Sequence, residues 1–119
     1  MLGSYENAFW VSLFLTVAIE TSVLFLAFRF LFRRPVPFIR KLFAGVVPSL
    51  ATLPYLWFLL PVYVRDRSLY VWSGEIGVVL VETVLLMGLL PVKWREALLL
   101  SAAANAASYG LGRIFWELV

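Results

Sequence analysis

The chain contains no cysteine, no histidine and a single aspartate, Asp66, among its 119 residues. Without cysteine and histidine, this chain cannot form disulfides, thiolate centres, histidine-ligated haem or chlorophyll, or zinc sites of the usual ligand types. Ser–His and Cys–His catalytic pairs are excluded as well, and a lone aspartate cannot form an intramembrane aspartate pair. We therefore predict no metal site and no cofactor, and no residue pattern indicates an enzyme.

Charged residues are also scarce, at 14% of the chain against about 25% in a typical soluble domain. Hydrophobic residues make up 63%, and the mean hydropathy is +0.94. A membrane-spanning helix needs roughly 20 mostly apolar residues, and the chain has room for four. We predict an all-α polytopic membrane protein of one domain, residues 1–119. The four spans are expected at residues 8–32, 38–63, 70–92 and 95–116.

Positive charge is concentrated at one end of these predicted helices. Seven Lys and Arg residues lie around the first and third loops: Arg29, Arg33, Arg34, Arg40, Lys41, Lys93 and Arg95. Three lie at the opposite end: Arg65, Arg67 and Arg113. An excess of Lys and Arg marks cytoplasmic loops, so we expect both termini outside, in the inner membrane of a bacterium or archaeon.

The basic loops have two readings, neither of which involves nucleic acid. The first is topology alone. The second is a docking site for anionic lipid headgroups or an acidic partner. Its residues would be Arg33, Arg34, Arg40, Lys41, Lys93 and Arg95.

A weak internal repeat links the two halves of the chain. The segment VAIETSVLFL (17–26) aligns with VLVETVLLMG (79–88), which places Glu20 on Glu82. The unusual residues coincide here, rather than the common leucines. This coincidence indicates a duplicated unit.

After a register shift of six residues at the shorter second basic loop, GVVPSLATLP (45–54) aligns with SAAANAASYG (101–110), placing Ser49 on Asn105. Each half contains two predicted helices, so both halves enter the membrane in the same direction. This predicts parallel repeats related by an axis along the membrane normal. The two repeats would cover residues 8–63 and 70–117.

Polar side chains gather near the midpoints of the predicted spans. They are Glu20, Ser49, Thr52, Glu82, Ser101, Asn105 and Ser108. In the second and fourth helices they alternate with small residues on one face, which lets helices approach closely and hydrogen-bond across the contact. We expect these two helices either to pair together or each to pack against the Glu-bearing helix before it.

The two mid-membrane glutamates, Glu20 and Glu82, have no Lys or Arg at their depth. A charge there costs at least about 2.5 kcal/mol, and desolvation favours the neutral form of a carboxyl. We expect both to be largely protonated, turned into the bundle and hydrogen-bonded to the polar layer, sharing a proton if they meet. Glu75, two turns before Glu82, is either an interfacial carboxylate near Arg65 and Arg67 or the outer step of a polar track.

Two prolines lie inside the second predicted helix, Pro48 and Pro54. Each removes a backbone hydrogen bond and favours a kink, and Pro54 leaves the carbonyl of Leu50 without its usual donor. Such a kink can serve as a hinge or ligand site in a transporter, or it can simply shape the packing.

These features favour a small accessory or scaffolding subunit of a larger membrane complex, its helices clamped by the polar layer. Its partners would be the bilayer and either other membrane subunits or further copies of itself. The alternative is a small proton- or cation-coupled transporter or channel that uses Glu20 and Glu82, with Glu75 as a further binding candidate. In length, helix number and a buried Glu in the first helix, the architecture resembles the small multidrug-resistance transporters. The second buried glutamate, Glu82, departs from that pattern.

Overall fold

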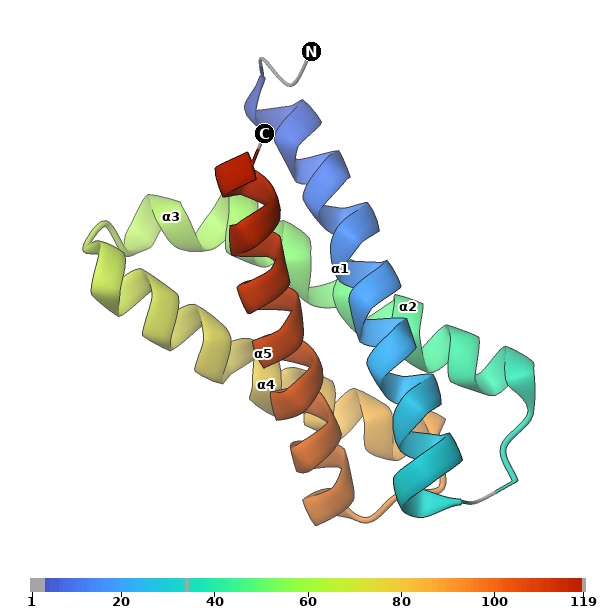
Figure 1. Cartoon of the computed structure of the whole chain (residues 1–119). Coiled ribbons are helices and arrows are strands. Elements are labelled where there is room, and N and C mark those ends of the chain that lie inside the picture. The colour runs from blue at the N-terminus through green and yellow to red at the C-terminus, as the bar shows by residue number, and fades with distance from the viewer. Residues whose placement is uncertain (1–3, 34, 119) are drawn as a thin grey trace.

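The computed structural model describes residues 4–33 and 35–118, and over these residues the chain is almost entirely helical, with no strand. The elements are α1 (Tyr5–Ala27), the π-helical turn η1 (Phe28–Phe32), α2 (Phe38–Pro54), the π-helical turn η2 (Tyr55–Leu59), α3 (Leu60–Tyr63), α4 (Arg67–Leu89) and α5 (Trp94–Leu118) (Figure 1). The all-α prediction is confirmed. The first two helical stretches begin and end within a few residues of the predicted limits. Apolar runs and prolines mark the limits of these helices in the sequence.

Three helical stretches are long and apolar enough to cross a membrane: Tyr5–Phe32, Phe38–Tyr63 and Arg67–Leu89. The prediction of a helical membrane protein is confirmed to this extent. The fourth expected span is present as α5, a helix of 25 residues, but it is not among the candidates found in the described residues. Its serine, asparagine, glycine and arginine residues lower its mean hydropathy, so a fourth crossing stays a prediction.

The four long helices are arranged as a ring. The helix α1 packs against α2 and α5, and α4 packs against the same two neighbours, so α1 and α4 lie diagonally opposite. Of the two packing alternatives, the structure shows the second, in which α2 and α5 each pack against the Glu-bearing helix before them. The start of α1 and the end of α5 lie at the same end of the bundle (Figure 1).

Packing is tighter in the half of the bundle next to the basic loops. Nine buried apolar residues form one cluster there: Leu24, Ala27, Phe28, Val36, Ala44, Leu86, Leu90, Ala97 and Leu100. The cluster in the other half contains only Phe9, Leu13 and Leu53 as buried members. Because helix association within lipid depends on close van der Waals packing, the half with the larger cluster is the firmer one.

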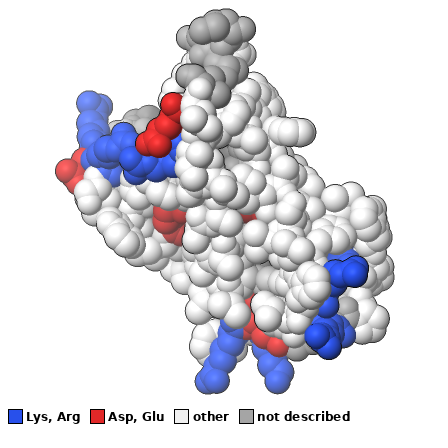
Figure 2. Space-filling model, viewed as in Figure 1, with Lys and Arg blue, Asp and Glu red and all other residues white. Residues whose placement is uncertain are grey.

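Lys and Arg side chains lie at the two ends of the bundle, and the face between them is nearly free of charge (Figure 2). At the end with the larger cluster, the Arg40 Nε donates a hydrogen bond of 2.9 Å to the carbonyl of Leu89. This places a cation at the C-terminus of α4, where the helix dipole favours positive charge.

Prolines leave the C-terminal half of the second helical stretch short of backbone donors. Pro61 lacks the N–H that would bond the carbonyl of Trp57 in α-helical register, or that of Leu56 in π-helical register. Both carbonyls are instead satisfied by tyrosines from neighbouring helices. The Tyr5 hydroxyl donates to Trp57 at 2.7 Å, and the Tyr70 hydroxyl donates to Leu56 at 2.6 Å.

Replacing Tyr70 by Phe is expected to lower the free energy of unfolding by about 1 kcal/mol, the usual net value of such a hydrogen bond. Thermal unfolding in detergent, followed by circular dichroism, measures the change. Tyr63→Phe is the matched control, because Tyr63 is 81% exposed. Equal effects of the two substitutions would contradict the role assigned to the Tyr70 hydroxyl.

The backbones of α1 and α2 cross in contact at Gly45. A Cβ atom at this position would collide with the Thr21 hydroxyl and lie 3.0 Å from the Thr21 Cα. The Thr21 hydroxyl is buried at this crossing and has no hydrogen-bond partner among the described residues. Only a glycine allows this approach, because both the hydroxyl and the backbone behind it block a side chain.

Gly45→Ala is therefore expected to destabilise the protein by about 1–3 kcal/mol, the usual cost of overpacking. The control is Gly77→Ala, since a Cβ on Gly77 meets no atom within 4 Å. This control should be neutral, or stabilising by about 0.5–1 kcal/mol, because alanine favours a helix over glycine. Unfolding titrations in mixed detergent compare the two, and a Gly45→Ala protein as stable as the control would disprove the close crossing.

Candidate functional site

Buried polar residues from all four long helices meet near the middle of the bundle. They are Glu20, Ser49, Thr52, Glu82, Thr83, Ser101 and Asn105. The glutamates are among the least accessible, with Glu20 5% and Glu82 2% exposed. The sequence analysis named all of these as candidate site residues except Thr83. The polar residues thus converge within the bundle.

Glu82 on α4 is held by side chains from two other helices. The Asn105 amide donates to its Oε1 at 2.6 Å, and the Thr52 hydroxyl lies 3.0 Å from its Oε2. The same hydroxyl lies 2.8 Å from the carbonyl of Pro48. A hydroxyl has one proton to donate, so both contacts of Thr52 are satisfied together when Glu82 carries a proton on Oε2.

Glu20 on α1 accepts a hydrogen bond of 3.2 Å from the Ser49 hydroxyl on α2. Glu20 and Glu82 line the same cavity and also the same small void beneath it, so the two carboxyls share one layer. Neither pairs with a Lys or Arg among the described residues; their hydrogen-bond partners there are two hydroxyls and an amide.

The other polar-layer residues extend this network. The Ser101 hydroxyl donates to the carbonyl of Val79 at 3.1 Å, which ties α5 to α4. Ser108 does not bond a carboxyl. Its hydroxyl donates to Thr16 on α1 at 3.2 Å, and farther out the Trp116 indole donates to Ser12 at 3.1 Å. A polar seam thus runs along the contact between α1 and α5.

Sequence reasoning missed this seam, although a signal was present. Ser12, Thr16 and Glu20 follow one another at intervals of four residues, which places them on one face of α1. The tyrosines that cap the proline-freed carbonyls were also missed. Those contacts join residues far apart in sequence, and no local spacing indicates them.

A cavity of about 420 Å³ extends from the polar layer toward the end where α1 begins. Its ionisable lining residues are the carboxyl groups of Glu20, Glu75 and Glu82 and the guanidinium groups of Arg67 and Arg113. Its aromatic lining residues are Tyr5, Trp57, Tyr70, Tyr109 and Trp116. Such a volume lies within the range of about 300–1,000 Å³ typical of small-molecule sites.

On the other side of the polar layer the bundle is closed. A void there measures about 10 Å³ and is bordered by Leu24, Ala44, Leu86 and Leu100. These leucines and the alanine belong to the larger apolar cluster. The cavity therefore reaches the buried carboxyls from one end only.

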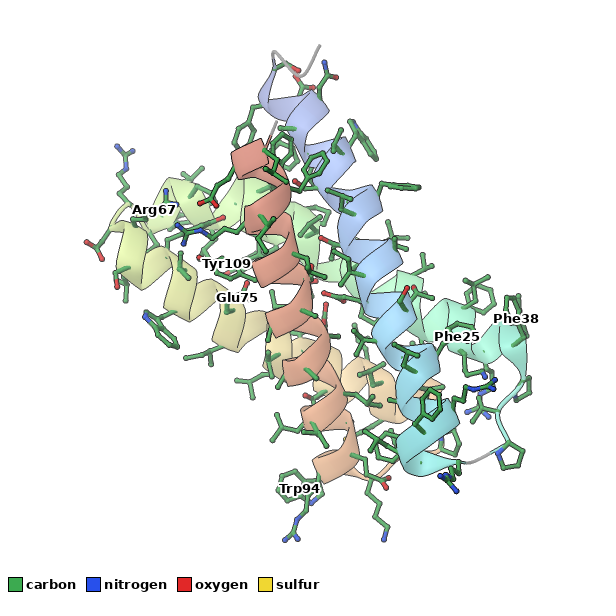
Figure 3. All side chains as sticks on the ribbon, in the orientation of Figure 1. Phe25, Phe38, Arg67, Glu75, Trp94 and Tyr109 are labelled. Carbon is green, nitrogen blue, oxygen red and sulfur yellow. The ribbon has the colours of Figure 1, made fainter. Side chains whose placement is uncertain are left out.

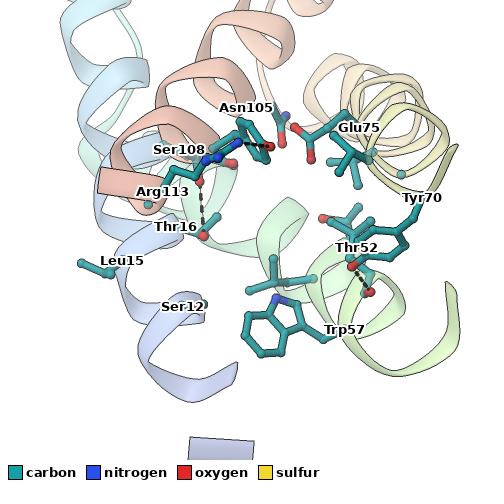
Figure 4. Close-up of a pocket in the computed structure, with 18 of the residues that line it drawn as sticks. Ser12, Leu15, Thr16, Thr52, Trp57, Tyr70, Glu75, Asn105, Ser108 and Arg113 are labelled. Atoms are coloured by element: carbon teal, nitrogen blue, oxygen red, sulfur yellow. Dashed lines mark hydrogen bonds between the residues drawn. The ribbon is translucent and has the colours of Figure 1, made fainter. Parts of the chain in front are cut away.

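Glu75 is half-buried in the cavity wall, two turns along α4 from Glu82. Figure 3 places it beside Tyr109, with Arg67 farther toward the outer end. Arg113 and Glu75 project into the cavity from opposite walls, and Arg113 donates to the Tyr109 hydroxyl at 3.4 Å (Figure 4). Glu75 thus shares one cavity with both Glu82 and Arg67, whereas Arg65 does not line it, and the choice between its two roles stays a prediction.

The basic residues considered for docking lie at the opposite end from this cavity, and several pack on the protein itself. The Lys41 ammonium lies 4.7 Å from the centre of the Phe25 ring, and the Arg95 guanidinium lies 5.3 Å from that of Trp94. Arg33 ends η1 in the left-handed conformation, with φ of 53°. Lys93 donates through its backbone N–H to Glu96. Arg34 lies outside the described residues.

Asn105→Ala should lower the free energy of unfolding by about 1–3 kcal/mol, because Glu82 loses its shortest hydrogen bond in a buried site. Ser108→Ala, which removes a longer bond from a half-buried hydroxyl, should cost less than half as much. Both are measured by thermal unfolding in the same detergent. A smaller loss for Asn105→Ala than for Ser108→Ala would show that the amide does not hold Glu82.

Comparisons of the chain with protein-family models, with curated proteins and with solved structures found no match. The chemistry of the cavity therefore rests on its own side chains, which are three carboxyls, two guanidinium groups and a wall of hydroxyls, one amide and aromatic rings.

Proposed function

We propose that the chain is a small membrane transporter that binds a proton or another cation at Glu20 and Glu82. The observation that supports this most is the cavity of about 420 Å³, which reaches both carboxyls from one end while apolar residues close the other. A buried ionisable group within a membrane span is a functional candidate by default. A cavity that leads to two such carboxyl groups gives a ligand a route to them.

The proposed orientation follows from the basic loops. With those loops in the cytoplasm, the cavity opens to the outside, and both chain ends lie outside. The location would be the inner membrane of a bacterium or archaeon. In this arrangement α5 is the fourth span, and its polar face is explained by the hydrogen bonds that it supplies to α1 and α4.

Two parallel repeats are part of the proposal. Ser49 and Asn105 occupy aligned positions in the two halves, and each donates to the carboxyl of the helix before it, on Glu20 and Glu82 respectively. The diagonal placement of α1 and α4 agrees with a two-fold axis along the bundle. Such an axis would bring the two carboxyls together as a pair that titrates jointly.

At this pair of carboxyls, a proton and a cation would exchange by competing for the same binding site. In the protonated pair, hydroxyl and amide partners satisfy the neutral carboxyls. Loss of a proton creates a negative charge without a cationic partner, and a cation in the cavity would neutralise it. Release to the other side requires the larger apolar cluster to open, and Pro48 and Pro54 in α2, each of which favours a kink, offer a hinge.

In proteoliposomes, a pH gradient or a membrane voltage should drive cation or proton flux through the wild-type protein. Glu82→Gln should reduce it to the level of empty liposomes, because the amide keeps the shape but cannot exchange a proton. Glu6→Gln is the control, since Glu6 is exposed in the first turn of α1 and does not line the cavity. Flux is read with a pH-sensitive dye trapped inside, and an absence of any gradient-driven flux in the wild type would overturn the proposal.

A second candidate is the accessory or scaffolding subunit, favoured by the hydrogen bonds that join all four helices at the polar layer. Gln at positions 20 and 82 would preserve most of these bonds, so a host complex would assemble normally with both substitutions. Native mass after mild detergent extraction distinguishes the two candidates. Fixed stoichiometry with larger subunits supports the scaffold, whereas a monomer or homo-oligomer supports transport.

A further inference from the structure

Two cations in the first turn of α2 are held against neighbouring helices by uncharged groups. The Lys41 ammonium lies 4.7 Å from the centre of the Phe25 ring on α1. The Arg40 Nε donates a hydrogen bond of 2.9 Å to the carbonyl of Leu89, at the end of α4. Residues 21–65 contain no Asp or Glu. Both cationic side chains are therefore positioned by the fold, but neither of these contacts neutralises a positive charge.

Apolar side chains that the bundle leaves exposed lie next to these cations. Phe38, Ile39 and Phe43, in the first two turns of α2, are each more than half exposed. The Phe38 ring packs on Phe25 of α1, with 5.3 Å between the ring centres. Figure 2 shows Lys and Arg atoms gathered at this side of the bundle, and Figure 3, in the same orientation, places Phe25 and Phe38 beside them. Positive charge and apolar surface thus lie together at one corner of the bundle.

This corner fits a phospholipid with a negatively charged headgroup better than a soluble acidic protein. A soluble protein would have to cover the exposed rings as well as the charges, whereas a lipid supplies an anion and acyl chains in one molecule. If the bundle spans the bilayer, the start of α2 lies near the headgroups, and Lys41 lies three residues, roughly 4.5 Å, beyond it. Long cationic side chains reach the headgroup region from such a depth. Basic pockets between membrane helices bind anionic headgroups in this way.

We propose that the phosphate group of an anionic phospholipid binds at the first turn of α2, between Arg40 and Lys41, with its acyl chains along the exposed face of α1 and α2. Arg40 donates to Leu89 through Nε, and its two terminal amino groups match two phosphate oxygens. The Lys41 ammonium acts as a point charge beside the same phosphate. The Cα atoms of the two residues are about 3.8 Å apart, so one phosphate can contact both side chains. This inference goes beyond the proposed function, because it involves neither the cavity nor the glutamates.

A lipid bound at this turn would strengthen the closed half of the bundle. Arg40 contacts the end of α4 and Lys41 contacts α1, so a shared phosphate would connect three helices. Ala44, one turn farther along α2 than Arg40, belongs to the larger apolar cluster. A ligand that binds only the folded state raises its stability. The unfolding temperature of the protein should therefore depend on the charge of the lipid headgroup.

Native mass spectrometry counts the lipids that stay on the intact protein when it is released from detergent micelles. The probe is phosphatidylglycerol, titrated in competition with phosphatidylcholine of the same acyl chains, which carries no net charge. The first phosphatidylglycerol should bind the wild type at least about tenfold more tightly than phosphatidylcholine does, because two cations contact its phosphate. Arg40→Gln and Lys41→Gln should each lower this affinity about fivefold, or about 1 kcal/mol. Lys41→Arg, which keeps the charge, should retain it.

Arg95→Gln is the matched control, because it removes one positive charge from the same end of the bundle. Arg95 lies 5.3 Å from the centre of the Trp94 ring, and Figure 3 places Trp94 well apart from Phe25 and Phe38. Salt screens exposed charges that are far from each other, so the affinity of this variant for phosphatidylglycerol should change less than about twofold. Far-ultraviolet circular dichroism verifies that every variant is folded.

Equal losses of affinity in Lys41→Gln and Arg95→Gln would show that the charges act only through their overall field, and would overturn a defined site. Phosphatidylcholine that binds as tightly as phosphatidylglycerol would overturn it too. Displacement of the lipid by an equal concentration of dissolved glycerol phosphate would show an anion site that does not require a lipid, against the proposal. Phosphatidylglycerol should also raise the unfolding temperature of the wild type but not of Lys41→Gln, and an equal rise in both would place the stabilising lipid elsewhere.

Discussion

The structure depends on how a buried carboxyl group is satisfied. Glu82 is buried near the middle of the bundle, where a carboxyl without partners is costly, and its partners come from other helices. Asn105 and Thr52 come from two different helices and hold its two oxygens at 2.6 and 3.0 Å. This requirement fixes the rotation of α2, α4 and α5 about their axes.

Much of the fold could be predicted from the sequence. Apolar runs and their proline and charged boundaries placed the helices within a few residues, and the depth of Glu20, Glu82 and Asn105 indicated a common polar layer. The cavity could not be predicted. It depends on how far α4 and α5 separate and on which side chains occupy the gap, and neither is encoded in local periodicity. The partner of Ser108 was unpredictable for the same reason, since two helices offered it acceptors at similar depth.

The two candidate functions place opposite demands on one set of hydrogen bonds. A clamp works best when every partner of the carboxyls is permanently satisfied, as polar contacts between membrane helices generally are. In a binding site, by contrast, the carboxyls must give up those hydrogen-bond partners and bind a ligand with little loss of free energy. The structure combines a firmly packed half with a hollow half, and the glutamates lie at the boundary. Motion of the hollow half could therefore change the surroundings of the carboxyls without disrupting the larger apolar cluster.

Pro61 has no N–H to donate, and the hydroxyls of two tyrosines take over that role. The backbone at Leu56 and Trp57 is held by hydroxyls from α1 and α4 instead of by its own helix. Loss of either tyrosine leaves one carbonyl without its donor while the proline is present. A residue at position 61 that restores the N–H can satisfy only one of the two carbonyls, so changing the proline first makes only one of the two tyrosines dispensable. Among divergent sequences of this fold, this constraint would appear as correlated change at positions that share no side-chain contact.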